Sequence, residues 1–231
     1  RDPTDIRLNN AYGMLLFRRG HAKESIAYFR TAIKKQTWRN PNPYCGQEYF
    51  NLGLALEADG QDAKAFDAFF KATWSAETQG AGFYWLSCLA ARNGSFEQAL
   101  DFAKNSLVRN WHNMDARTLH AAILRHLSKN NHDFLQESLQ IDPLCMGCLY
   151  EAALQDGNLD KWKEAMRPEA HNYLILALDY IKAGFYTDAL NILQNCTEAN
   201  PLVLYYQGYA YHLAGKEDAA KEYFQKAVFN A

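Results

Sequence analysis

The chain has no apolar run long enough to cross a bilayer and almost no excess charge of either sign. A membrane-spanning helix needs about 20 apolar residues, whereas apolar runs such as residues 173–178 are short. Lysine and arginine total 24 and aspartate and glutamate 26, a net charge of -2, which gives no electrostatic reason to bind nucleic acid. We therefore expect neither a membrane nor a nucleic acid as partner.

Familiar catalytic motifs are also missing. The sequence contains no His-Glu-x-x-His, no Gly-x-Ser-x-Gly and no phosphate-binding glycine loop. Its histidines are scattered, and His120 and His126 are six positions apart, which does not place them on one helix face. We expect a protein that is not an enzyme, with no catalytic residue and no cofactor.

The cysteines are few and odd in number, which does not resemble a disulfide framework. They are Cys45, Cys88, Cys145, Cys148 and Cys196. The pair Cys145 and Cys148 has no second pair and no histidine at ligand spacing, so we expect no metal. A functional thiol pair stays open, because the position after Asp142-Pro143 is a predicted helix N-terminus, which can lower a thiol pKa.

What the sequence does contain is a globular composition and an internal repeat. Hydrophobic residues make up 48% and charged residues 22%, a balance typical of folded proteins. Gly53, Gly60, Ala65, Phe69 and Ala72 follow one another at spacings of seven, five, four and three. This pattern, with Leu-Gly at its start, resembles the tetratricopeptide repeat at every key position.

Each spacing has a physical reason in a helix hairpin. Gly53 has no side chain, so two helices can approach closely there, and Phe69 fills the space between them. Gly60 suits the left-handed turn that ends the first helix. Ala65 and Ala72 are small where the second helix crosses the first.

The pattern recurs along the chain, so we predict an all-α, right-handed superhelical solenoid of antiparallel helix hairpins, with about seven pairs. The copies carry, in order, Tyr12, Gly13, Gly20, Phe29 and Ala32; the set above; Leu86, Gly94 and Ala99; Tyr173, Gly184, Ala189 and Leu193; and Gly208, Gly215, Ala220, Phe224 and Ala227. The region 116–168 is irregular, with expected helices at 116–127, 132–141, 145–154 and 159–166. We expect one domain over 1–231.

Both ends of the chain look cut, since Ala231 follows a predicted second helix with no polar helix after it. We expect a fragment of a longer protein. A cytoplasmic location is expected, with export left open because the chain starts at Arg1 rather than Met.

A second resemblance rests on residues 47–53, 68–74, 116–125 and 172–180. These segments are similar to the helical tail of large bacterial proteins of unassigned function that carry a sugar-mutarotase-like β-domain. The resemblance implies a bacterial origin and a carbohydrate-related parent protein. It places no catalytic residue in this chain.

In tetratricopeptide repeat proteins the first helix of each pair lines the concave face, so the resemblance implies where a partner binds. Helical periodicity then selects the residues on that face. They are Arg7, Asn10, Met14, Phe17, Arg18, Gln47, Phe50, Leu54, Glu57, Tyr84, Cys88, Arg92, Thr118, Ala122, Arg125, Tyr205, Tyr209 and His212. Some of these side chains would instead pack between repeats.

Two functions follow as hypotheses. The first is a scaffold that binds a protein or peptide, or another domain of the same chain, on its concave face. Because Arg7, Arg18, Arg92 and Arg125 are expected to add positive charge along that side, with Arg18 and Arg92 facing solvent, the partner would carry acidic and apolar residues. The second is a helical accessory tail of a bacterial carbohydrate-active protein.

Overall fold

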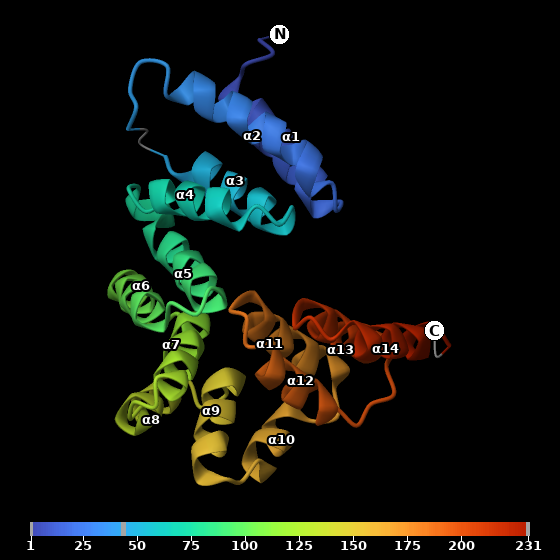
Figure 1. The fold of residues 1–231 in the computed structure, drawn as a ribbon. Coiled ribbons are helices and arrows are strands. Elements are labelled where there is room, and N and C mark those ends of the chain that lie inside the picture. The colour runs from blue at the N-terminus through green and yellow to red at the C-terminus, as the bar shows by residue number, and fades with distance from the viewer. Residues whose placement is uncertain (1, 43–44, 230–231) are drawn as a thin grey trace. The chain divides into compact units, whose positions relative to one another are not determined.

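The protein is built from α-helices joined by short turns. A computed structural model describes residues 2–42 and 45–229, and within these ranges it contains fourteen helices and no strand (Figure 1). In chain order they are α1 (Ile6–Arg18), α2 (Ala22–Gln36), α3 (Gln47–Ala58), α4 (Asp62–Ala72), α5 (Ala76–Arg92), α6 (Phe96–Arg109), α7 (Met114–His126), α8 (His132–Ile141), α9 (Met146–Asp156), α10 (Asp160–Met166), α11 (Ala170–Lys182), α12 (Tyr186–Gln194), α13 (Pro201–Leu213) and α14 (Glu217–Phe229). The predicted all-helical fold of about seven pairs is confirmed. Ala231, on which the expectation of a cut C-terminal end rests, lies outside the described residues.

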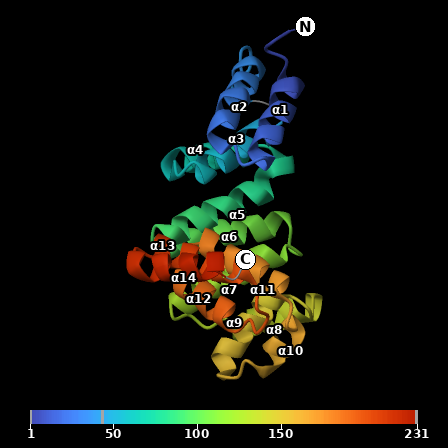
Figure 2. The same ribbon diagram turned by 90° about the vertical axis from the view of Figure 1, so that its right-hand side faces the viewer.

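Within a hairpin, the glycine of the first helix lies directly against the aromatic ring of the second. A Cβ atom on Gly53 would stand 2.6 Å from Cδ1 of Phe69, and one on Gly208 would stand 2.8 Å from Cδ1 of Phe224. Real Cβ atoms do not come so close to a ring, so any side chain here would push the helices apart. The predicted close approach at Gly53 is confirmed, and the same device recurs at Gly208. The two helices of that second hairpin, α13 and α14, lie side by side (Figure 1 and Figure 2).

The turn between paired helices also follows the prediction. Gly60 has a φ of +73°, the left-handed region that side chains rarely adopt. This conformation lets the Gln61 N–H donate to the Leu56 carbonyl at 2.8 Å, which satisfies one of the orphan carbonyls at the helix end.

The helices form two compact units. Unit 1 comprises residues 1–89 and 101–111, and unit 2 comprises residues 90–100 and 112–231, so the boundary runs through α5 and α6. Unit 1 has a core of fully buried apolar residues that includes Leu56, Phe69 and Leu86. The prediction of one domain over 1–231 remains a prediction.

Unit 2 contains the irregular hairpins α7–α8 and α9–α10, which use large buried side chains in place of the repeat signature. Trp162 is fully buried and packs against Tyr150 and Tyr173, with ring centroids 4.9 and 5.6 Å apart. Arg117 is fully buried as well, and its Nη1 donates to the Ser138 hydroxyl at 2.9 Å. Among the helices described, none is long and apolar enough to cross a membrane.

Candidate protein-binding surfaces

A ladder of side-chain amides joins the first helices of the first two pairs in unit 1. The Gln47 Nε2 atom donates to Asn51 Oδ1 at 2.9 Å, and the Asn51 Nδ2 atom donates to Asn10 Oδ1 at 2.8 Å. Asn51 is almost completely buried, whereas Asn10 and Gln47 are half-buried. Two of the predicted site residues, Asn10 and Gln47, are thus brought together through a third that the sequence did not single out.

The other predicted residues of unit 1 differ in how far they are exposed. Arg7 and Arg18 are exposed at the two ends of α1. Met14, Phe17 and Phe50 are half-buried and pack against the core around Phe69, so they contribute to stability. Two further predicted residues are half-buried, and these are Glu57 on α3 and Tyr84 on α5.

Both predicted arginines of unit 2 are used inside the unit. Arg92 is half-buried and donates to the Lys182 carbonyl from Nε at 3.1 Å and from Nη2 at 2.8 Å. Arg125 is ion-paired with Glu151 at 2.8 Å and with Asp188 at 3.1 Å. The expectation that Arg92 faces solvent is wrong, because its guanidinium donates to a carbonyl of a neighbouring helix. The Arg125 guanidinium is likewise held by acceptors on neighbouring helices.

The charged groups around Arg125 form a network of hydrogen bonds and ion pairs. Glu151 is fully buried and also accepts a hydrogen bond from the Tyr180 hydroxyl at 2.6 Å. His126 Nε2 lies 3.1 Å from the Asp188 carboxylate, and its ring stacks on Phe185 at 4.2 Å. Burial raises the pKa of Asp188, but the His126 hydrogen bond and the Arg125 charge outweigh it, so that pKa is lowered. These charged groups pair with one another inside unit 2, so few of their hydrogen-bonding atoms are available to a partner.

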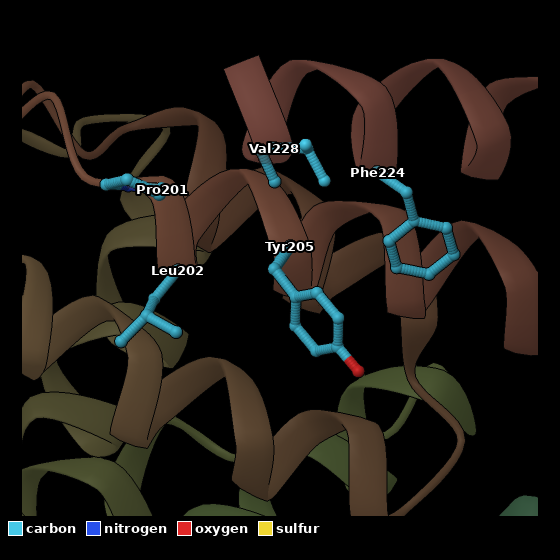
Figure 3. Close-up of a pocket in the computed structure, with 6 residues that line it drawn as sticks. Pro201, Leu202, Tyr205, Phe224 and Val228 are labelled. Carbon is cyan, nitrogen blue, oxygen red and sulfur yellow. The ribbon is translucent and has the colours of Figure 1, made fainter. Parts of the chain in front are cut away.

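An open apolar groove of about 510 Å³ lies on α13–α14 in unit 2. Its walls are the six residues drawn in Figure 3, which are Pro201, Leu202, Tyr205, Phe224, Ala227 and Val228. Leu202 is 56% exposed, Tyr205 48% and Val228 77%, although all three are large apolar or aromatic residues.

Three predicted site residues lie along one face of α13, because positions four and three apart share a face. Tyr205 opens onto the groove, and its ring centroid is 5.4 Å from that of Phe224. Tyr209 is half-buried, with its ring 6.3 Å from Tyr206. His212 is exposed, and its Nδ1 atom lies 2.8 Å from Glu217 Oε1.

A family model described as tetratricopeptide repeat matches residues 11–77 and 174–231, which together are more than half of the chain. The chain belongs to the tetratricopeptide repeat family. Proteins of this family are generally non-enzymatic scaffolds for protein interactions. The matched parts cover most of hairpins α1–α2 and α11–α12 and all of α3–α4, and they include the six residues of the apolar groove on α13–α14. Of the amide ladder, Gln47 and Asn51 lie in the match and Asn10 lies just before it.

Solved structures of other tetratricopeptide repeat proteins share this fold at low sequence identity. A tetratricopeptide repeat protein from Parabacteroides merdae ATCC 43184 is 15% identical, with a TM-score of 0.60 over 98% of this chain and 93% of that chain. The APC/C hetero-tetramer Cut9-Hcn1 is 14% identical, with a TM-score of 0.54 over 100% and 41%. The human IFIT1 dimer with m7Gppp-AAAA is 16% identical, with a TM-score of 0.51 over 98% and 64%. These likenesses concern the fold alone.

Three groove residues, Pro201, Leu202 and Val228, are not among the residues that the sequence pattern selected. Leu202 and Val228 are the more exposed of them. A signal for them exists in the repeat register, because residues 155 positions apart correspond between α3–α4 and α13–α14. Val228 corresponds to Thr73, and Leu202 to Gln47. An apolar residue where the other repeat is polar could have drawn attention to this surface.

Proposed function

We propose that the protein is an interaction scaffold whose α13–α14 repeat binds an amphipathic helix of a partner protein. The observation that carries this proposal is the exposed apolar groove between Tyr205, Phe224 and Val228. Contiguous apolar surface at the protein exterior is a common mark of a protein-binding site.

The kind of partner follows from the corresponding repeat, α3–α4. There, the surface that matches the groove is covered by α5 of the same chain. The Trp85 ring stacks on Phe69 with centroids 5.4 Å apart and planes 9° apart. Thr78 donates its hydroxyl to the Ala72 carbonyl at 2.7 Å. A Cβ atom on Gly82 would lie 3.0 Å from Cγ2 of Thr73.

Covering this surface removes it from water. Phe69 and Ala72 are 0% exposed and Thr73 is 4% exposed under α5. Val228, which corresponds to Thr73, is 77% exposed. The α13–α14 repeat therefore presents a surface of the same geometry, with a more apolar rim, that nothing in the described residues covers in the same way.

The contacts of α5 define the sequence that would bind. Thr78, Gly82 and Trp85 are at positions i, i+4 and i+7, which form one face of a helix. A partner helix would carry a small residue where Gly82 stands and an aromatic residue where Trp85 stands. The aromatic ring would stack on Phe224 as Trp85 stacks on Phe69.

A labelled synthetic peptide of residues 75–92, with Cys88 replaced by serine, tests this proposal. Titrated into the protein, it should give saturable binding by fluorescence anisotropy. A Trp85→Ala peptide should bind at least about tenfold more weakly, because a buried Trp is typical of interface hot spots.

The protein offers a matched pair of variants for the same titration. Val228→Asp introduces a charge in the groove and should abolish binding. Val108→Asp is the control, because Val108 is 76% exposed on α6 and lines no part of the groove. Equal affinities of the two variants for the peptide would contradict the proposal.

A second candidate site is the amide ladder with Arg7 and Arg18 on unit 1. The ladder fixes the Asn10 and Gln47 amides between two helices, which suits an extended peptide whose backbone needs donors and acceptors. An RNA partner, as in the human IFIT1 structure, is not favoured, because the net charge is -2 and Arg92 and Arg125 are both paired internally. A capped oligoadenylate serves as the comparison ligand and should not bind.

A further inference from the structure

Two thiols meet at the start of α9, in the part of unit 2 that lacks the repeat signature. Cys145 is the N-cap residue of α9, and Cys148 lies in its first turn. Both are free thiols, and the hydroxyl oxygen of Thr118 on α7 lies 3.6 Å from the Cys145 sulfur and 3.8 Å from the Cys148 sulfur. One hydroxyl group therefore touches both sulfur atoms.

The residue between the thiols explains this closeness. A Cβ atom on Gly147 would collide with the Thr118 side chain, so only glycine allows α7 to approach the turn. The N-cap residue Cys145 has extended backbone angles, with φ -64° and ψ 96°, and its sulfur contacts Thr118 rather than capping the helix. Thr118 on α7 is therefore the common neighbour of the two sulfur atoms, on either side of Gly147.

The two thiols differ in access. A pocket of about 180 Å³ opens between α7, α9 and α11, and Cys145 lines it whereas Cys148 does not. Cys145 is 6% exposed and Cys148 is 0% exposed. Two carboxylates, Asp115 and Asp179, line the same pocket. Asp179 is paired with Lys182 at 2.7 Å, and Asp115 is exposed.

We propose that Cys145 and Cys148 form a thiol–disulfide exchange site that is oxidised by small, positively charged disulfides entering this pocket. Cys145 is the attacking thiol because it lines the pocket, and Cys148 is the resolving thiol behind it. The carboxylates favour a cationic reagent over an anionic one.

The reaction balances in two exchanges. The Cys145 thiolate attacks one sulfur of the reagent R–S–S–R, forming Cys145–S–S–R and releasing R–S⁻, which takes a proton from water. Cys148 then loses its proton to water and attacks the Cys145 sulfur, forming the Cys145–Cys148 disulfide and releasing the second R–S⁻. The protein dithiol is oxidised by two electrons, and the reagent is reduced to two thiols.

The electrostatics of the two thiols agree with these roles. The neighbouring Cys148 thiol, together with the Cys148 backbone N–H and Thr118, lowers the pKa of Cys145 to about 7, against burial and the charge of Asp142. The neighbouring Cys145 sulfur and burial raise the pKa of Cys148. At Cys45 and Cys196, burial raises the pKa.

Cystamine, the disulfide of 2-aminoethanethiol, is the probe for the test. The protein is treated at neutral pH, quenched at intervals and mapped by mass spectrometry of its peptides. The parent protein should form the Cys145–Cys148 disulfide and keep no adduct, while Cys148→Ser should retain a mixed disulfide on Cys145. Cys145 should react about five- to tenfold faster than Cys45 or Cys196, since its greater thiolate fraction outweighs its lower nucleophilicity.

Two controls separate this site from a merely structural cysteine pair. Cys88→Ser removes a fully buried thiol from another helix and should leave the rate unchanged. Asp115→Asn should slow cystamine by about two- to fivefold and not slow the anionic bis(carboxymethyl) disulfide, as expected for one exposed charge. The proposal is overturned if Cys145 reacts no faster than Cys45 and Cys196, or if Cys148→Ser leaves no adduct on Cys145.

Discussion

Arg125 donates two parallel hydrogen bonds to Glu151, from Nε at 2.8 Å and from Nη2 at 3.0 Å. A third contact, to Asp188 at 3.1 Å, ties the same guanidinium to α12. Since Glu151 is fully buried, its charge depends on Arg125 and on the Tyr180 hydroxyl. This cluster joins α7 and α9, which lack the repeat signature, to α11 and α12, which carry it.

Replacing Arg125 with methionine should destabilise the protein by about 3–5 kcal/mol, because Glu151 would keep a buried charge without its cation. The measurement is urea denaturation followed by circular dichroism. The double variant Arg125→Met with Glu151→Gln should recover part of this loss, since no unpaired buried charge remains. Arg7→Met, at an exposed position, is the control and should change stability little. A loss from Arg125→Met no larger than that of the control would contradict the structural role of the cluster.

Acid should weaken the same cluster through Asp188. Its folded pKa is lowered, so it stabilises the fold above its unfolded value of about 3.9. That contribution is lost as pH falls through the folded pKa. We expect Asp188→Asn to be less stable than the parent at pH 7, with the difference shrinking below about pH 4. Asp101→Asn, at a 74% exposed side chain, should show no such trend. A difference that stays constant with pH would contradict this assignment.

The helix pairs could be predicted from the sequence because their signals are local. Gly53 and Phe69 repeat at a fixed spacing, and the bounds expected for the helix at 132–141 agree with α8. The ionic cluster could not be predicted, since Arg125, Glu151 and Asp188 lie on separate helices and follow no period. The burial of Arg117 could not be predicted either, because its partner Ser138 lies on another helix.

The candidate sites were predicted only in part. Helical periodicity placed Tyr205 and Arg18 on exposed surface, as the structure has them. It could not show that Arg92 would find the Lys182 carbonyl, because that contact spans 90 positions. Exposure of a repeat also depends on which helix covers it, which the repeat pattern does not encode. The resemblance to a tail beside a mutarotase-like domain and the cytoplasmic location remain predictions.

Gly53→Leu should cost at least about 1–3 kcal/mol through overpacking. A Cβ atom there would already stand 2.6 Å from the Phe69 ring, and Phe69 is fully buried and cannot move away freely. The control is Gly80→Ala on α5, where the nearest atom would be 3.5 Å away, so alanine should be neutral or slightly stabilising. Thermal unfolding of both variants beside the parent provides the measurement. A Gly53→Leu protein as stable as the parent would contradict the close approach.

Metal binding at the thiol pair should be absent. Among the described residues, no group of three or more histidine, cysteine or acidic side chains is placed to hold a metal ion, and two thiols do not complete a zinc site. Elemental analysis after purification in zinc-containing buffer should give less than one zinc per chain. Stoichiometric zinc that is lost in a Cys145→Ser, Cys148→Ser double variant would contradict this expectation.

Reversing the charge of Arg18 and of Arg92 should separate binding from stability. Arg18 is exposed in the last turn of α1, so Arg18→Glu should cost only about 0.3–1 kcal/mol through the helix dipole. Arg92→Glu removes two hydrogen bonds to the Lys182 carbonyl and should cost about 1–3 kcal/mol.

Peptides rich in Asp, Glu, Trp and Leu, selected on the parent protein from a displayed library, supply the binding measurement. If the amide-ladder surface of unit 1 binds such peptides, Arg18→Glu should lower their affinity about tenfold or more, while folded Arg92→Glu should retain it, because Arg92 is engaged inside unit 2. If the affinity falls only in Arg92→Glu, the peptides do not bind at the amide-ladder surface on α1, and this prediction is wrong.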